Sequence, residues 1–245
     1  MCGRFTLEAT PEDVRALCRY LEQPNFPPRY NIAPTQPIAT VRNEHGGRHF
    51  ALVRWGLIPS WVKDPANFTL LINARSETAA TKPSFRNPMK HHRCLIPASG
   101  FYEWCRTPEG KQPFYMTPAD GGLMAFAGLW ETWSDPDGGD MDTGAILTTE
   151  ANRSISRIHN RMPAILMPED FDAWLDTGNI MVRDAAKLLR PAPEDFLKAT
   201  PVSRRVNSVA NDDADLTVET SESEPLPAVK PGKKTPPSTD QLDLF

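Results

Sequence analysis

The sequence predicts an α+β protein in which a curled, mainly antiparallel, barrel-like β-sheet carries flanking helices. Three observations predict this class. The 25 prolines against 14 glycines favour many short elements and turns over a bundle of long helices. Short runs of β-branched and aromatic residues recur between turn-forming residues. The 245 residues, 40% of them hydrophobic, fit one large domain or two small ones, and because no internal repeat divides them we expect a single compact domain.

Eight segments have the length and composition of strands, and two Gly-containing segments between them are predicted to be turns. The predicted strands are 38–41, 49–55, 93–96, 101–105, 112–116, 123–129, 145–148 and 164–167. The predicted turns are 107–110 and 134–140.

One helix is signalled near the start of the chain. Thr10 can cap it, Pro11 suits its first position, and the carboxylate of Asp13 falls in its first turn. Apolar residues then recur at helical spacing. Further helices are predicted to begin at 168–170 and 193–195, where Pro-Glu-Asp recurs, and a short one is predicted over 74–81.

The net charge of −4 is distributed unevenly. After Asn207 eight acidic residues stand against three lysines, so the rest of the chain is close to neutral and is compatible with a local basic face. Composition divides the chain into a folded domain over 2–210, a disordered acidic and proline-rich linker over 211–240, and an apolar peptide over 241–245.

Composition also excludes several classes. No stretch approaches the roughly 20 apolar residues of a membrane span, and no leader opens the chain, so we expect a cytoplasmic protein. The four cysteines form no C-x-x-C pair, which predicts reduced thiols, no structural zinc and no cofactor. Cys18, Cys94 and Cys105 are expected to pack in the interior.

Cys2 differs from the other cysteines because removal of Met1 would leave it with a free α-amine beside its thiol. The amine of such a 1,2-aminothiol condenses with an aldehyde to an imine, and the thiol then closes a thiazolidine ring. An α-amine titrates at about 7.7–8.0, so a nucleophilic fraction exists at pH 7. Gly3 allows close backbone approach, and Arg4 offers a phosphate-binding fork. The alternative is that a small residue follows Met1 by chance.

Four further residues have both a functional and a structural interpretation. Asn73 either takes part in a site or caps a helix. Glu103, in an aromatic strand, either points inward with a raised pKa or faces solvent. His159 is either catalytic or structural. Trp61, on a loop, either stacks on an unpaired base or packs in the core.

Several segments together resemble the SOS response-associated peptidase (SRAP) family, whose members process abasic sites. They occur in family order through roughly residues 2–210, and the ordered set is specific although each piece alone is weak. The matching segments are Met1-Cys2-Gly3-Arg4-Phe5, Tyr30-Asn31-Ile32-Ala33-Pro34, Arg54-Trp55-Gly56-Leu57-Ile58-Pro59, Ile72-Asn73-Ala74-Arg75-Ser76-Glu77-Thr78, Pro97-Ala98-Ser99-Gly100-Phe101-Tyr102-Glu103-Trp104, Ile158-His159-Asn160-Arg161-Met162-Pro163 and Pro201-Val202-Ser203.

The resemblance implies a compact α+β domain with a positive channel for single-stranded DNA. It implies a covalent DNA link through Cys2, with chemistry assisted by Asn73, Glu103 and His159. It further implies that the DNA-binding residues are Arg4, Trp61, Arg75 and Arg161.

The aminothiol and the resemblance predict the same substrate, because a ring-opened abasic site carries an aldehyde at C1′. We therefore expect a thiazolidine crosslink to abasic single-stranded DNA that shields the lesion during repair. Two alternatives stay open: a thiol peptidase or autopeptidase with Cys2 as nucleophile, and a noncatalytic adaptor for single-stranded DNA and the sliding clamp.

The last five residues resemble the peptide by which bacterial replication and repair proteins dock on the sliding clamp. The expected clamp-binding residues are Gln241, Leu242, Leu244 and Phe245. The alternative is a chance hydrophobic terminus. We expect a monomer associated with the bacterial nucleoid, with DNA and the clamp as partners and no membrane contact.

Overall fold

The computed structural model describes residues 2–108, 110–135 and 138–220, and the statements of structure below concern these residues. The strands are β1 (Phe5–Leu7), β2 (Arg29–Ile32), β3 (Pro37–Glu44), β4 (Gly47–Trp55), β5 (Asn73–Arg75), β6 (Arg93–Ala98), β7 (Gly100–Thr107), β8 (Gly110–Pro118), β9 (Met124–Asp135), β10 (Gly139–Glu150), β11 (Arg161–Pro163), β12 (Ile165–Leu166) and β13 (Leu197–Pro201). The helices are α1 (Pro11–Cys18), α2 (Ser76–Ala79), α3 (Pro83–His91), α4 (Phe171–Leu175) and α5 (Val182–Ala185), with 3-10 turns η1 (Ile155–Arg157), η2 (Pro168–Asp170), η3 (Ala186–Leu188), η4 (Arg204–Asn207) and η5 (Ala214–Thr217).

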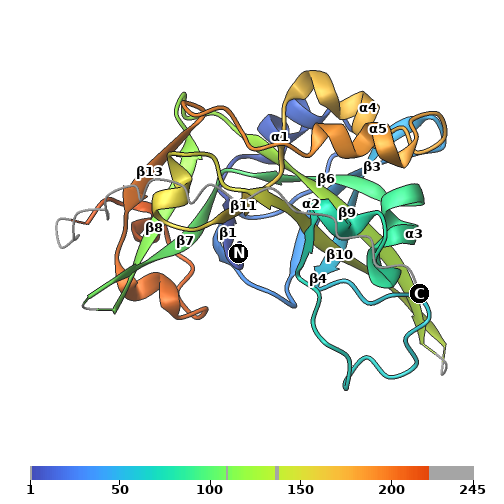
Figure 1. The fold of residues 1–245 in the computed structure, drawn as a ribbon, viewed down its shortest axis with the longest axis horizontal. Coiled ribbons are helices and arrows are strands. Elements are labelled where there is room, and N and C mark those ends of the chain that lie inside the picture. The colour runs from blue at the N-terminus through green and yellow to red at the C-terminus, as the bar shows by residue number, and fades with distance from the viewer. Residues whose placement is uncertain (1, 109, 136–137, 221–245) are drawn as a thin grey trace, which may run out of the picture.

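Within the described residues the strands form two sheets (Figure 1). The first is open and has the order β13-β8-β7-β1-β2. The second closes into a barrel of β10, β4, β3, β6 and β9, because β9 pairs with β6 on one side and with β10 on the other. Most pairings are antiparallel, whereas β10 runs parallel to β4 and β5. The predicted α+β class with a barrel-like sheet is confirmed.

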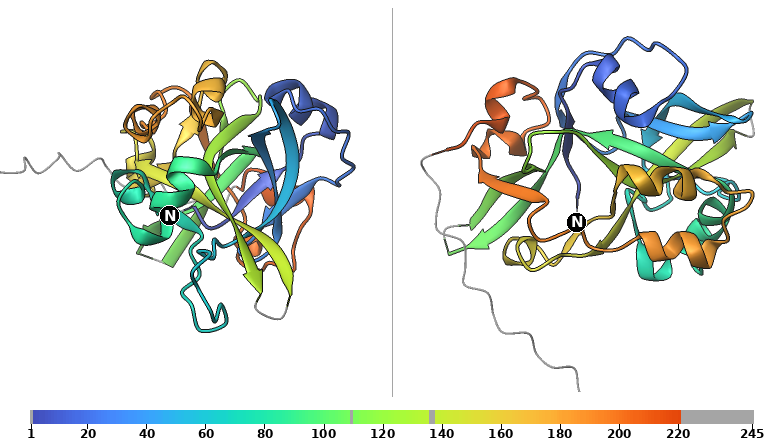
Figure 2. Two further views of the ribbon diagram at one scale, coloured as in Figure 1. Left: turned by 90° about the vertical axis from the view of Figure 1, so that its right-hand side faces the viewer. Right: turned by 90° about the horizontal axis from the view of Figure 1, so that it is seen from above.

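Strand β1 connects the two sheets. It pairs with β7 and β2 in the open sheet, and its Phe5 packs edge-on against two barrel residues, Trp55 at 5.2 Å and Phe126 at 5.8 Å between ring centroids. In the right-hand view of Figure 2, β1 accordingly runs between the open sheet and the barrel. The residues just before β1 are therefore held where the sheets meet.

All eight predicted strands are present, and most are longer than predicted. The predicted turn at 107–110 joins β7 to β8, with Thr107 opposite Gly110. The predicted turn at 134–140 is too wide, because Ser134 and Asp140 pair with each other inside the β9–β10 hairpin. The three-residue strands β1, β5 and β11 escaped prediction because they are too short to show alternation.

Helix α1 begins as predicted. The Thr10 side chain accepts a hydrogen bond from the Asp13 backbone N–H, and the Asp13 carboxylate accepts one from the Thr10 N–H, which completes a capping box. The helix predicted after 168–170 is η2 followed by α4, and the one predicted over 74–81 is reduced to α2. No helix among the described residues is long and apolar enough to cross a membrane.

The helix predicted at 193–195 was wrong. The carboxylate of Glu194 accepts hydrogen bonds from the backbone N–H groups of Arg153 and Ser154, so it caps another segment rather than its own. Leu197 then pairs with Pro118 as the first residue of β13. Helix α3 was missed because Pro88 lies inside it, and a proline there normally argues against a helix.

The linker predicted from residue 211 begins too early, because the described fold continues to residue 220. The carboxylate of Asp212 accepts hydrogen bonds from the backbone of Asn31 at 2.9 Å and from Nε of Arg29 at 2.6 Å. Leu216 is fully buried, and Glu219 forms a β-bridge with Val202. Residues 221–240 of the predicted linker and the peptide 241–245 lie outside the described residues.

Shortening the chain should show where the folded domain ends. A chain ending at residue 220 should unfold with the same free energy as the full-length protein, whereas a chain ending at 210 should lose about 3 kcal/mol, because it lacks the buried Leu216 and the Asp212 carboxylate. Urea unfolding followed by tryptophan fluorescence measures both. Equal stability of the two shortened chains would mean that residues 211–220 contribute nothing to the fold.

Candidate functional site around Cys2

Cys2 is the first described residue and is fully buried where the two sheets meet. Its backbone carbonyl accepts a hydrogen bond of 2.8 Å from Nδ2 of Asn73. Its thiol donates to the carbonyl of Arg4 at 3.7 Å. Burial is the main cause that raises the pKa of this thiol, and the carboxylate of Glu103 raises it further. The Cys2 thiol therefore lies near Glu103, and its raised pKa keeps it in the neutral form.

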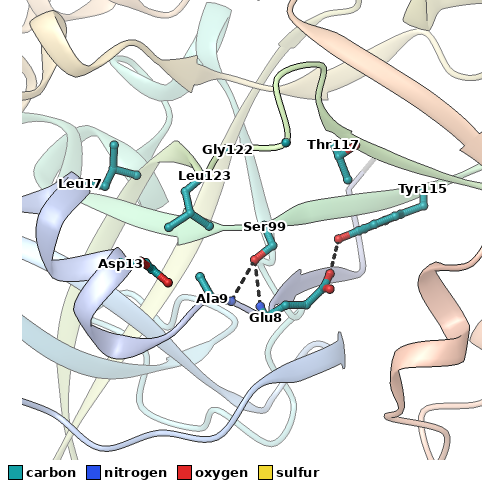
Figure 3. Close-up of a pocket in the computed structure, with 10 residues that line it drawn as sticks. Glu8, Ala9, Asp13, Leu17, Ser99, Tyr115, Thr117, Gly122 and Leu123 are labelled. Atoms are coloured by element: carbon teal, nitrogen blue, oxygen red, sulfur yellow. Dashed lines mark hydrogen bonds between the residues drawn. The ribbon is translucent and has the colours of Figure 1, made fainter.

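The far end of β1 is fixed by a polar cluster. The hydroxyl of Ser99 accepts hydrogen bonds from the backbone N–H groups of Glu8 and Ala9, and the Tyr115 hydroxyl donates to the Glu8 carboxylate. These residues line a cavity of about 610 Å³, and in Figure 3 their polar atoms point toward one another. Because these bonds join the residues of the cavity to one another, we interpret the cluster as a support for β1 rather than as a site.

Glu103 on β7 points into the protein, and its side chain is only 3% exposed. This decides between the two interpretations that the sequence left open. Burial raises the pKa of the Glu103 carboxyl above its ordinary value, and the nearby imidazole of His159 opposes the shift. A carboxyl of this kind can gain and lose a proton closer to neutral pH than a surface glutamate.

His159 follows η1 and approaches Glu103 from the other side. Its Nδ1 lies 4.0 Å from Oε1 of Glu103. Nδ1 also lies 3.0 Å from the backbone N of Arg161 and 3.2 Å from the Arg161 carbonyl oxygen, so it accepts from the first or donates to the second according to the tautomer. His159 also lines a cavity of about 650 Å³ together with Arg75, Glu150 and Arg161.

Asn73 begins β5, where the parallel pairing with β10 sets it opposite Ile146. It is not a helix cap, because α2 has Arg75 at its N-cap position and no side-chain cap. The buried Oδ1 of Asn73 has no hydrogen-bond donor among the described residues. A buried acceptor of this kind favours a ligand-binding role, since such atoms are normally satisfied.

The three predicted DNA-binding arginines occupy different surroundings. Nη1 of Arg4 donates to Oδ1 of Asn31 at 2.7 Å and to the carbonyl of Val206 at 2.8 Å, so this side chain also holds the C-terminal segment to β1 and β2. Arg75 is exposed at the 650 Å³ cavity. Arg161 lines the same cavity but its side chain is only 12% exposed and is paired with a carboxylate.

Trp61 lies on the loop between β4 and β5, which projects from the body of the molecule (Figure 1). It is 57% exposed, and its ring contacts Phe68 edge-on at 5.7 Å. The interpretation of Trp61 as a core residue was therefore wrong. The packing role expected of the other cysteines fits their burial, and Cys105 shares the face of β7 that carries Glu103, with its thiol 3.7 Å from the carbonyl of Arg157.

Sequence reasoning missed Glu77, whose carboxylate pairs with Arg161, and Asn31, which ties Arg4 to the C-terminal segment. Both belong to segments singled out by their likeness to a family, but neither had an individual signal. Their partners lie 84 and 27 positions away along the chain, so only the fold brings them together.

Comparison with known proteins now adds to this geometry. The sequence profile of the family described as SOS response associated peptidase (SRAP) matches residues 1–209. The chain belongs to the SRAP family. Among its curated relatives, the abasic site processing protein YoqW of Bacillus subtilis (strain 168) is 41% identical over 220 residues, covering 88% of this chain and 98% of the relative. The abasic site processing protein HMCES of Gallus gallus is 33% identical over 262 residues, covering 89% and 77%.

Solved structures of similar proteins have the same fold. A protein from Bacteroides thetaiotaomicron superposes with a TM-score of 0.81 at 26% identity and covers 89% of this SRAP chain and 100% of its own. A protein from Bordetella bronchiseptica gives a TM-score of 0.73 at 28% identity, covering 82% and 100%.

The raised pKa of the buried Glu103 carboxyl predicts how the stability of the protein depends on pH. Because the pKa of Glu103 is raised in the folded state, the wild-type protein loses stability as the pH rises from about 4.3, where an unfolded glutamate titrates, through the folded pKa. Glu103→Gln has no charge to bury and should become the more stable protein over that window. Chemical unfolding between pH 4 and 8 measures the difference, and a gap that is constant or widens toward low pH would contradict the assignment.

Proposed function

We propose that this SRAP protein recognises abasic sites in single-stranded DNA and links to them covalently through Cys2 after Met1 is removed. One arrangement supports the proposal: Asn73 donates a hydrogen bond to the carbonyl of Cys2, and Glu103, which lies near the Cys2 thiol, is in turn 4.0 Å from Nδ1 of His159. The relatives named abasic site processing proteins support the same substrate.

The covalent step balances without any cofactor. The α-amine of Cys2 attacks C1′ of the ring-opened sugar and forms a carbinolamine, which loses one water to give an imine. The thiol then adds to the imine carbon and its proton moves to the nitrogen, which closes the thiazolidine. The net reaction joins an aldehyde and an aminothiol with release of one water, and it is reversible by hydrolysis.

The site residues have separate tasks in this scheme. Glu103, with its raised pKa, passes protons as the carbinolamine loses water. His159, which lines the cavity together with Arg75 and Arg161, transfers a proton at the ring oxygen as the sugar opens. Asn73 orients the backbone of Cys2 through Nδ2 and leaves Oδ1 as an acceptor for the amine or a sugar hydroxyl.

The raised thiol pKa favours this order of events over peptidase chemistry. A cysteine peptidase needs a thiolate, and its thiol pKa is lowered by a neighbouring histidine. Burial and Glu103 instead raise the pKa of the Cys2 thiol. A neutral thiol is suited to attack second, after the amine has formed an electrophilic imine. The family description as a peptidase keeps Cys2-dependent autocleavage as the alternative.

We further propose that Arg4, Arg75 and Arg161 hold phosphates that flank the lesion and that Trp61 stacks on an unpaired base. Arg75 is the most accessible of these arginines, at the mouth of the cavity that His159 lines. The exposed ring of Trp61 offers a face for stacking worth about 1–3 kcal/mol. A single strand suits this arrangement because it bends freely, whereas a duplex must be unstacked first.

Blocking either nucleophile of Cys2 should abolish crosslinking. The wild-type protein should shift abasic single-stranded DNA on a denaturing gel, and its intact mass should show loss of Met1 and addition of the DNA minus one water. Cys2→Ala should give no heat-stable product, because the imine cannot be trapped as a ring.

Acetylation of the Cys2 amine separates the two enzymatic alternatives. The acetylated protein keeps its thiol, so peptidase activity would survive whereas thiazolidine formation would not. Undiminished crosslinking by the acetylated protein or by Cys2→Ala would refute the aminothiol mechanism.

We propose a second contact, through the peptide 241–245, which lies outside the described residues. Its sequence, Gln-Leu-Asp-Leu-Phe, suits a hydrophobic groove such as that of a sliding clamp, with apolar pockets for the leucines and Phe245 and a polar rim for Gln241. Tethering to the clamp would raise the local concentration of the protein at replication forks.

Deleting residues 241–245 should remove this contact without affecting the enzyme. The full-length protein should bind the bacterial clamp with micromolar affinity by calorimetry, and the shortened chain should not bind. Crosslinking of free abasic DNA should be the same for both. Equal clamp binding by the two chains would show that the peptide is not the docking element.

A further inference from the structure

Arg161 does not present a free guanidinium to the cavity that it lines. Nη1 lies 2.5 Å from Oε1 of Glu77, and Nη2 lies 3.0 Å from Oε2, so the carboxylate and the guanidinium form a two-pronged ion pair. Nη2 also donates to the carbonyl of Thr148 at 2.6 Å. The edge of Arg161 that could bind a phosphate in the same two-pronged way is occupied by Glu77.

Glu77 lies near two arginines whose positive charges could otherwise neutralise a DNA phosphate. Arg161 is the main cause that lowers the pKa of its carboxyl, and Arg75 lowers it further, so the carboxylate is ionised between two of the arginines at the cavity. The Glu77 side chain is 46% exposed and stands in the single turn of α2. It can therefore swing into water, whereas Arg161 is anchored by Thr148.

We propose that Glu77 acts as a built-in competitor of DNA phosphate for Arg161, and that it thereby weakens binding of undamaged single strands. This inference rests on the proposed DNA function. An intact strand must displace Glu77 and gains only noncovalent contacts, so it dissociates readily. An abasic strand that displaces Glu77 can be captured by the covalent bond at Cys2. The competitor therefore raises the selectivity of the site for lesions.

The test uses Glu77→Gln, which keeps the size of the side chain but removes its charge. Its affinity for an intact single-stranded oligonucleotide, measured by fluorescence anisotropy, should rise roughly two- to fivefold at low salt, the range expected for loss of one exposed ion pair. The slope of log affinity against log salt should steepen by about 0.7, as for one additional phosphate contact. Intact DNA should also inhibit crosslinking of abasic DNA more strongly.

Glu150→Gln is the matched control. Glu150 lines the same cavity, and its backbone is paired with that of Arg161 between β10 and β11. No ion pair involves Glu150 among the described residues. The control removes the same charge from the same surface without touching the Arg161 fork, so its affinity should change less than that of Glu77→Gln.

A double variant tests whether the gain in DNA affinity of Glu77→Gln depends on Arg161. In an Arg161→Ala background, Glu77→Gln should no longer raise the affinity, since the two residues would then not be coupled. Thermal unfolding of each variant confirms that it is folded.

The results distinguish a failure of the proposed DNA function from a failure of the competitor role of Glu77. A wild-type protein that neither binds nor crosslinks single-stranded DNA would refute the proposed function itself. If the wild-type protein crosslinks normally but Glu77→Gln binds intact DNA equally or more weakly, the competitor role is overturned, and weaker binding would identify Glu77 as a residue that orients Arg161. If Glu150→Gln gained the same affinity for intact DNA, general surface charge would explain the effect, and the competitor role would be overturned.

Discussion

The placement of β1 between the open sheet and the barrel is the constraint on which the rest of the site depends. Hydrogen bonds to β7 and β2 fix its register, and packing of Phe5 on Trp55 and Phe126 fixes its depth. Chain ends usually fray because few contacts oppose their conformational entropy. Here the chain is anchored up to Cys2, so a thiol that would otherwise sample many positions is brought to one place.

The site also shows how one buried carboxylate organises two different groups. Burial raises the pKa of the Cys2 thiol and Glu103 raises it further, while Oε1 of Glu103 lies 4.0 Å from Nδ1 of His159. Burial disfavours the charged form of the Glu103 carboxyl, which makes this arrangement costly for the folded state.

The C-terminal segment, residues 211–220, also supports the region around β1 and β2, although its composition predicted a disordered linker. Residues 211–220 are polar and acidic, yet Asp212 accepts hydrogen bonds from backbone donors of β2, and Leu216 is fully buried in a cluster with Tyr102 and Val206. Arg4 donates to the carbonyl of Val206, just before this segment, and its partner Asn31 donates to the carbonyl of Asn211 within it. A short acidic stretch can thus be part of a fold when its few apolar and charged groups each find a specific partner.

The sequence by itself determined the fold class, all eight predicted strands and the start of α1, because periodicity and caps are local properties. It left open whether Glu103 faces inward and whether Asn73 caps a helix. It wrongly predicted a helix at 193–195 and placed the start of the linker too early, since Glu194 and Asp212 bond to partners about 40 and 180 positions away. Only the tertiary structure decided these points and revealed the Glu77–Arg161 pair, because they depend on which distant segments the closed barrel brings into contact.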